Sequence, residues 1–207
     1  MTKIACVVPL YYCSESLYLI IDKFFESIKK YYPQIELITI DDFSPLTLPD
    51  RWPVKARNKQ NRGYTYAVNH GLKIAFKQAD IVIVANDDLE IQKGDLDRFL
   101  KIKDIGIYFP SDTASGALDT FGSIWGMNKT TFKIMGLLNT EYKHFCSDKL
   151  YYQKAVKKGV PIIHWRDICI KHHESATYNL VNKEQLLKED LYKFEKRSKG
   201  LNSRIKS

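Results

Sequence analysis

Short runs of apolar, mostly β-branched residues alternate along the first half of the chain with stretches whose apolar positions follow the helical period. The run at residues 81–85 predicts a strand buried on both faces, and further strands are expected at residues 4–8 and 35–40. Apolar side chains from Leu17 to Ile28 predict a helix, with Ser14 or Ser16 as its N-cap. A second helix is expected from Asn61 to about Gln78.

The same alternation continues to the end of the chain. The further expected elements are a short strand near Val54, a short helix near 94–101, strands at 105–109 and 123–127, helices from Thr130 and over 148–158, strands near 161–164 and 168–171, and a charged helix from about Lys183. Strands that alternate with helices predict an α/β fold with a largely parallel sheet.

Length and composition fit one enzyme-sized domain. The chain has 207 residues, 44% of them hydrophobic, which is enough for a substantial core. It has no run of 18 apolar residues and no N-terminal signal segment, so we expect neither a transmembrane helix nor secretion. The four cysteines lack metal-type spacing and are expected to be reduced thiols of a cytoplasmic protein. A net charge of +8 suits anionic substrates, nucleic acid or an anionic membrane surface.

Polar or aromatic residues follow three of the predicted strands directly. Asp87 and Asp88 follow the strand at 81–85, Asp41 and Asp42 follow the strand at 35–40, and the first strand leads into Tyr11. Ligands of open α/β sheets bind outside the carboxyl ends of the strands, so these residues predict a lined pocket. Paired carboxylates there could hold Mg²⁺ or Mn²⁺ against a phosphate. The alternative is that Asn and Asp serve as ordinary turn residues.

The chain lacks the glycine-rich loops that usually cradle phosphates. Neither a GxGxxG segment nor a P-loop is present, and residues 1–62 contain no glycine at all. This disfavours dehydrogenases, ATPases and sugar-1-phosphate nucleotidyltransferases. A metal ion held by carboxylates is the substitute that remains.

Six short motifs occur in an order that resembles a known family. They are Val7–Tyr11 as an opening strand, Asp41–Ser44 as a "DDGS"-like element, Asn61–Gly63 with Ala67, Asn69, Gly71 and Ala75 as an "N-x-G … A-x-N-x-G" helix, Asn86–Asp88 as a "DxD"-type motif, Ser147-Asp148 as an "ED"-like motif, and Ile170–His172 as a late "V-x-H" element. Over about residues 3–178 the chain is similar to family 2 glycosyltransferases of the GT-A fold.

The resemblance implies a fold and an activity. It implies a single Rossmann-like GT-A domain over residues 1–178, followed by a charged helix and basic tail over 179–207. It also implies an inverting, hexosyltransferase-like enzyme that depends on Mn²⁺ or Mg²⁺. Such an enzyme moves a sugar from a nucleotide sugar, here expected to be UDP-linked, to a hydroxyl of a glycan, a lipid-linked sugar or a protein.

The resemblance also implies which residues hold the donor. Asp42 would accept a hydrogen bond from a pyrimidine N3–H, unless it only shapes a turn. Tyr11 would stack on the base or else belong to the core, and Pro9 is expected in the same pocket. Arg62 would steady the diphosphate or the turn, or else be an exposed arginine at the start of a helix. Asp87 would face the ribose or the sugar.

The metal and the base are implied in the same way. Asp88 would bind the metal, and of the two adjacent histidines His172 has the spacing of the family's metal or phosphate contact, whereas His173 would face the other side of its strand. Asp148 would be the general base, with an N-cap as its alternative role. The family usually has Glu where this chain has Ser147.

The acceptor site and the C-terminus are less specific. Acceptor contacts are expected in the loop at 110–121, and Trp125 would either stack on a sugar or lie in the core. Six basic residues follow position 192 against one acid, which suits a peripheral contact with an anionic membrane, a contact with nucleic acid, or a solvated end. Two other readings of the whole chain are a basic nucleic-acid-binding protein and a sugar-nucleotide binder without turnover.

Overall fold

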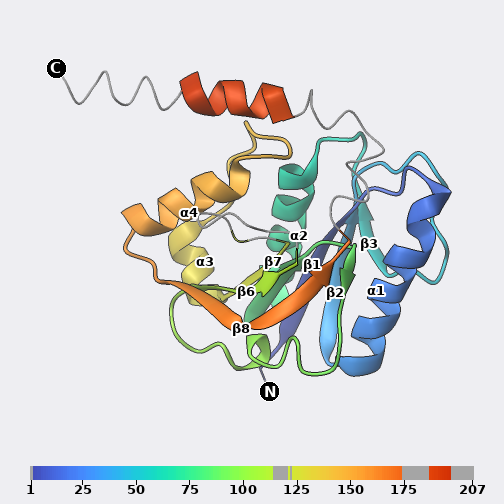
Figure 1. Cartoon of the computed structure of the whole chain (residues 1–207), viewed down its shortest axis with the longest axis horizontal. Coiled ribbons are helices and arrows are strands. Elements are labelled where there is room, and N and C mark those ends of the chain that lie inside the picture. Colours follow the sequence, from blue (N-terminus) through green and yellow to red (C-terminus); the bar gives the residue numbers. More distant parts are fainter. Residues whose placement is uncertain (1, 114–120, 122, 174–186, 197–207) are drawn as a thin grey trace.

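A curled, mostly parallel sheet of eight strands forms the centre of the protein (Figure 1). The computed structural model describes residues 2–113, 121, 123–173 and 187–196. The strands are β1 Ile4–Leu10, β2 Ile35–Asp41, β3 Val54–Arg57, β4 Ile81–Ala85, β5 Leu89–Glu90, β6 Ile107–Asp112, β7 Ile124–Asn128 and β8 Ile162–His172, in the spatial order β3-β2-β1-β4-β7-β6-β8-β5.

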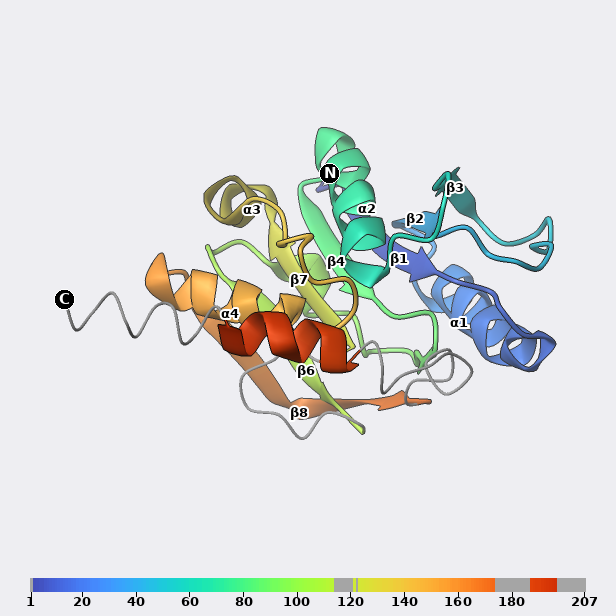
Figure 2. The same cartoon turned by 90° about the horizontal axis from the view of Figure 1, so that it is seen from above.

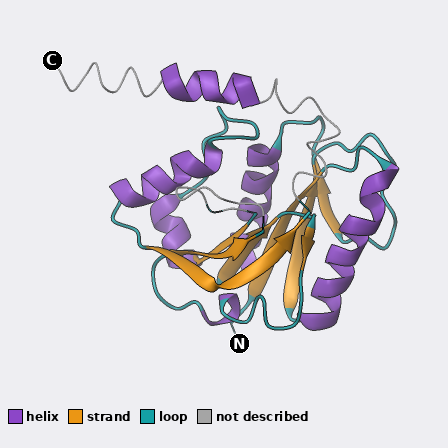
Figure 3. Ribbon diagram, viewed as in Figure 1, coloured by secondary structure: helices purple, strands orange, loops and turns teal. Residues whose placement is uncertain are grey.

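Helices cover both faces of this sheet (Figures 2 and 3). They are η1 Glu15–Leu17, α1 Tyr18–Tyr31, α2 Tyr64–Gln78, η2 Phe99–Lys101, α3 Lys129–Met135 and α4 Ser147–Lys157, where η marks a 3₁₀ turn. Ser14 caps η1 by accepting a hydrogen bond from the backbone N–H of Ser16. The α/β fold with a mostly parallel sheet, predicted from the alternation of elements, is confirmed.

The first four strands of the sheet form a parallel unit. β1 pairs in parallel with β2 on one side and β4 on the other, and β2 pairs in parallel with β3. α1 and α2 are the crossover connections, as parallel pairing requires. The carboxyl ends of β1, β2 and β4 therefore meet at one edge of the sheet, which is the edge that bears Tyr11, Asp42 and Asp88.

The two faces of β1 serve two cores. Cys6 and Val8 point into the cluster that α1 covers, whereas Ala5 and Val7 point into the cluster that α2 covers. Burial raises the pKa of the Cys6 thiol to about 12, so this cysteine is an inert core residue.

Gly71 lets α2 approach β1 closely. A Cβ at this position would lie 2.3 Å from Cγ1 of Val7 and 3.3 Å from Cγ1 of Ile40, so the "A-x-N-x-G" spacing has a packing reason. In Gly71→Ala, overpacking costs about 1–3 kcal/mol, which outweighs the gain of about 1 kcal/mol in helix propensity. We expect the free energy of unfolding in urea to fall, by up to about 2 kcal/mol, while exposed Lys73→Ala on the same helix leaves it within about 0.5 kcal/mol. A more stable Gly71→Ala variant would contradict this packing.

Three sequence-based boundaries were wrong. β8 is one strand rather than two, because it pairs with β6 across a register shift in which Pro110 faces Trp165 and Ser111 faces Cys169. β6 extends to Asp112, into the predicted loop, because β8 supplies partners for residues 110–112. The helix expected near 94–101 is a series of turns that ends in η2.

The C-terminal prediction can be followed only in part. Residues 187–196 are helical, and the rest of the predicted helix and basic tail lies outside the described residues. The same holds for residues 114–120 of the expected acceptor loop. No helix among the described residues is long and apolar enough to cross a membrane.

Candidate active site

Asp42 lies at the carboxyl end of β2 and is almost entirely buried. Its carboxylate accepts hydrogen bonds from Nδ2 of Asn58 (2.7 Å) and from the backbone N–H groups of Arg62 (3.0 Å) and Gly63 (2.6 Å). Its own N–H donates to the carbonyl of Leu10 at the end of β1. Asp42 therefore fixes the loop that enters α2 against the first strand.

The neighbouring Asp41 has a different role. Its Oδ1 accepts from the backbone N–H and the hydroxyl of Ser44, and its Oδ2 pairs with Arg57 at 2.8 Å. These contacts close a turn in which Phe43 has a left-handed backbone, with φ of 66°. Asp41 thus stabilises its own turn, whereas Asp42 accepts hydrogen bonds from the loop before α2.

The other predicted donor contacts lie around Asp42. Tyr11 is partly exposed just beyond β1, whereas the next residue, Tyr12, is the core aromatic. Pro9 is partly buried in β1 opposite Ile40. Arg62 is exposed, and its guanidinium Cζ lies 3.7 Å from the centre of the Tyr66 ring.

A histidine from the end of β8 meets the acidic pair after β4. Nε2 of His172 lies 2.9 Å from Oδ1 of Asp88, and both side chains are nearly buried. The pairing of β5 with β8 produces this contact, since Leu89 faces His172 and the N–H of His173 donates to the carbonyl of Asp88. The side chain of His173 instead contacts Glu90, with Nε2 2.7 Å from Oε1.

Asp87 shares this buried environment. Its Oδ2 is buried and has no hydrogen-bond partner within the described part of the chain. Burial first, and then the charge of Asp88, raise the pKa of Asp87 well above its usual value. Two adjacent carboxylates in such a site repel each other unless a positive charge lies near them.

The residues around Asp88 could supply part of the coordination shell of a divalent cation. Oxygen atoms of a bound substrate would complete that shell. The described residues contain no group of three or more His, Cys, Asp or Glu side chains that could hold a metal by itself. A carboxylate and an imidazole that face each other, beside the orphaned oxygen of Asp87, are suitable donors for part of a coordination shell. Mg²⁺ in particular is usually bound by one or two carboxylates plus substrate phosphates.

Asp148 lies in the first turn of α4 rather than at its cap. The N-cap is Cys146, which has a left-handed backbone (φ 62°) and makes no side-chain capping bond. Ser147, the first helical residue, is buried. The N-terminal position favours the ionised form of the Asp148 carboxylate. The N-cap role considered for Asp148 is therefore wrong.

Tyr64 is a partly buried residue at the start of α2, and sequence reasoning missed it. Burial raises the pKa of its hydroxyl, the charges of Asp148 and then Asp88 raise it further, and a hydrogen bond with Trp125 opposes the shift. Tyr64 therefore lies within electrostatic range of both carboxylates. Its position directly after Asn61-Arg62-Gly63, at the start of a helix, is the only signal in the sequence that could have indicated it.

Trp125 belongs to the core. It is 2% exposed in β7 and packs near the rings of Phe121 and Tyr151. Of the two roles considered for Trp125, stacking on a sugar or packing in the core, the structure shows packing in the core.

Comparisons with known proteins agree with this fold. The model of glycosyl transferase family 2 matches residues 5–111. S. aureus TarS, of which one structure is a complex with UDP, has 16% identity and a TM-score of 0.63 over 83% of this chain and 60% of its own. The mannosyltransferase PcManGT from Pyrobaculum calidifontis, in complex with GDP-Man and Mn²⁺, has 15% identity and a TM-score of 0.63 over 94% of this chain and 64% of its own.

The catalytic domain of Drosophila β1,4-galactosyltransferase 7, in complex with xylobiose, has 15% identity and a TM-score of 0.60 over 86% of this chain and 73% of its own. No curated protein matches the chain by sequence. The chain thus spans under two thirds of the length of the TarS and PcManGT structures, and identities this low show the GT-A fold alone. The family model covers just over half of the chain, and the chain belongs to glycosyl transferase family 2.

Proposed function

We propose that this protein transfers a sugar from a nucleotide sugar to an acceptor hydroxyl, with inversion at the anomeric carbon and with the help of Mn²⁺ or Mg²⁺. The observation that carries the proposal is the contact of Asp88 with His172 at the carboxyl edge of the sheet. The strand end that bears Asp42 lies at the same edge, on the other side of β1. Ligands of α/β sheets bind at such an edge.

Asp42 would recognise the base. An ionised carboxylate has about four acceptor sites. Asn58 donates to Oδ1 of Asp42 and Gly63 donates to Oδ2, while the N–H of Arg62 is shared between both oxygens at 3.2 and 3.0 Å. The N3–H of uracil would take one of the two positions that this shared bond fills, which is why we propose a UDP-linked donor. Thymine presents the same edge, whereas adenine has no ring N–H there and guanine presents its N1–H beside an amino group. Tyr11, Pro9 and Arg62 would line the same pocket and contact the base and the diphosphate.

Asp88 and His172 would hold the cation between the sheet edge and the diphosphate. When bound, the cation would neutralise the negative charge that develops on the leaving nucleoside diphosphate. Asp87, whose buried Oδ2 has no hydrogen-bond partner among the described residues, would accept from a hydroxyl of the ribose or the sugar. The nearly buried setting of these side chains excludes water and strengthens each polar contact.

Asp148 would act as the general base. It would accept the proton of the acceptor hydroxyl as that oxygen attacks the anomeric carbon. With a single base and no enzyme nucleophile, the reaction is one displacement. The product therefore has inverted configuration at the anomeric carbon. The charges of both Asp148 and Asp88 raise the pKa of the Tyr64 hydroxyl, which would therefore stay protonated near these two groups.

The recognition of the base is tested by Asp42→Ala. A hydrogen bond to a charged group contributes about 1.5–3 kcal/mol, so we expect the Kd of a UDP-sugar to rise about 10- to 100-fold. Isothermal titration in Mn²⁺ measures this change, and thermal melting shows how much of it follows from loosening of the loop before α2. Exposed Asp50→Ala is the matched control. An unchanged Kd, or equal affinity for purine and pyrimidine donors, would refute this role of Asp42.

A further inference from the structure

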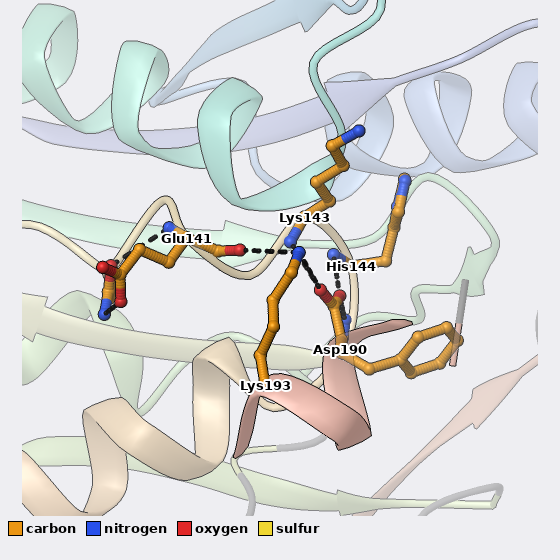
Figure 4. Close-up of polar contacts among 7 residues, drawn as sticks. Glu141, Lys143, His144, Asp190 and Lys193 are labelled. Atoms are coloured by element: carbon orange, nitrogen blue, oxygen red, sulfur yellow. Dashed lines mark hydrogen bonds and ion pairs between the residues drawn. The ribbon is translucent and has the colours of Figure 1, made fainter. Parts of the chain in front are cut away.

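A buried carboxylate of the C-terminal helix accepts hydrogen bonds from three consecutive backbone N–H groups. Asp190 is 2% exposed, and it accepts from the N–H of Lys143 (3.3 Å), His144 (2.9 Å) and Phe145 (3.0 Å). Figure 4 shows the carboxylate facing this loop. Successive N–H groups directed at one anion form a concave nest that favours negative charge.

Asp190 is the one buried position of residues 187–196, whose other side chains are exposed or partly buried. Burying a carboxylate is costly unless it is fully hydrogen-bonded, so its burial here depends on the three N–H groups of the loop. Lys193, one turn later, adds to the contact. Its Nζ donates to the carbonyl of Glu141 at 3.2 Å and lies 3.5 Å from Oδ1 of Asp190 (Figure 4).

The loop held by Asp190 leads directly to the proposed base. Phe145 is followed by Cys146, whose left-handed backbone turns the chain into α4, and Asp148 is the second residue of that helix. A change in the direction of residues 143–145 would therefore shift the start of α4. A shift of about 1 Å at a reacting group can reduce a rate by about 10²-fold.

The same loop also contacts the donor side of the site. The carbonyl of Lys143 accepts from the N–H of Thr65 at 3.0 Å, and a Cβ at Gly63 would lie 2.7 Å from that oxygen. Gly63 is the residue whose N–H donates to Asp42. The loop thus contacts both the segment that Asp42 holds and the helix that carries Asp148.

We propose that Asp190 is a positioning residue for glycosyl transfer. By fixing the N–H groups of residues 143–145, it sets the start of α4 relative to the donor loop and so holds Asp148 at the attacking hydroxyl. This role rests on the function proposed above. It assigns a task in the reaction to a C-terminal helix that would otherwise be taken for a solvated end.

Asp190→Asn tests the role with little change in size. The amide keeps one acceptor oxygen but turns an NH₂ group toward N–H donors and removes the charge. In hydrogen exchange followed by mass spectrometry, we expect peptides covering residues 143–145 to exchange about tenfold faster or more. We expect kcat for transfer, per folded molecule, to fall about 10- to 100-fold. The KM of the donor should stay within about threefold, because Asp42 keeps its own hydrogen bonds. Exposed Glu195→Gln on the same helix is the control and should match the wild-type protein.

The outcomes separate this role from a purely structural one. A lower melting temperature with unchanged kcat per folded molecule would overturn the proposal, as would unchanged exchange at residues 143–145. If Asp190→Asn does not fold, Lys193→Met decides, since it removes the contacts of Lys193 with Glu141 and with Asp190 but keeps the Asp190 carboxylate. We expect faster hydrogen exchange of the loop and a kcat lowered about threefold or more in that variant, and wild-type values for both would overturn the proposal.

A wild-type protein that uses no donor would refute the proposed function and the positioning role together. Wild-type turnover with an unaffected Asp190→Asn variant would refute the positioning role alone.

Discussion

Asp148→Asn is expected to fold, to bind donor normally, and to lose about 10²- to 10⁴-fold in transfer rate, which is the usual contribution of a positioned general base. The amide has nearly the same shape but cannot accept the proton of the acceptor hydroxyl. The cost to folding is small because Cys146, and not Asp148, is the N-cap of α4. The variant loses the interaction of a carboxylate with the helix N-terminus, which contributes about 0.3–1 kcal/mol.

Three measurements on this variant separate catalysis from folding. Thermal melting reports stability, titration calorimetry reports donor affinity, and product formation reports transfer. Slow hydrolysis of the donor should fall less than transfer, because water is small and reaches the anomeric carbon by other routes. Asp50→Asn, at an exposed position, is the control. A variant that melts several degrees lower but turns over normally per folded molecule would make Asp148 structural.

Asp88→Asn is expected to reduce turnover by about 10²- to 10³-fold and to remove its dependence on Mn²⁺ or Mg²⁺. The amide oxygen is neutral, so the site keeps only His172 and Asp87 near a dication. In the wild-type protein a chelator should produce the same loss, and added Mn²⁺ should reverse it. In the variant, the chelator should have little further effect.

A neighbouring carboxylate provides the control for Asp88. Glu90 lies two residues further along, where it pairs with Lys171 and His173 at the surface instead of with His172. Glu90→Gln should therefore keep the wild-type response to Mn²⁺ and chelator. If turnover of the wild-type protein is the same in chelator as in Mn²⁺, Asp88 and His172 do not hold a cation that the reaction needs.

The sheet was predictable because its central strands carry a local signal. β1 and β4 are buried on both faces, and each is a nearly continuous apolar run. β2 is buried from Ile38 onward, and both β2 and β4 lead into an acidic pair. The single long strand β8 was not predictable, since its middle residues lie in a register shift that depends on pairing with β6. The burial of side chains along β8 alternates irregularly, so β8 has no continuous apolar run from which it could be predicted.

The structure brings several residues of the expected site to one edge of the sheet, but their contacts could not be predicted from the sequence. The sequence indicated that Asp42 would bind the nucleotide base. It gave no sign that the Asp42 carboxylate already accepts hydrogen bonds from Asn58, Arg62 and Gly63. Asp190 was missed for a related reason. It lies in a charged stretch typical of a solvated helix, and only the nest formed by residues 143–145, more than 40 positions earlier, buries it.

The central claim is that this protein binds a nucleotide sugar at the carboxyl edge of its sheet with the help of a divalent cation. Titration calorimetry with UDP-, dTDP-, CDP- and GDP-sugars, each in Mn²⁺ and in chelator, tests it most directly. We predict that UDP- or dTDP-sugars bind in Mn²⁺ and that this binding weakens at least about tenfold in chelator. The absence of donor binding under every condition, together with salt-sensitive binding of DNA or RNA, would contradict the claim.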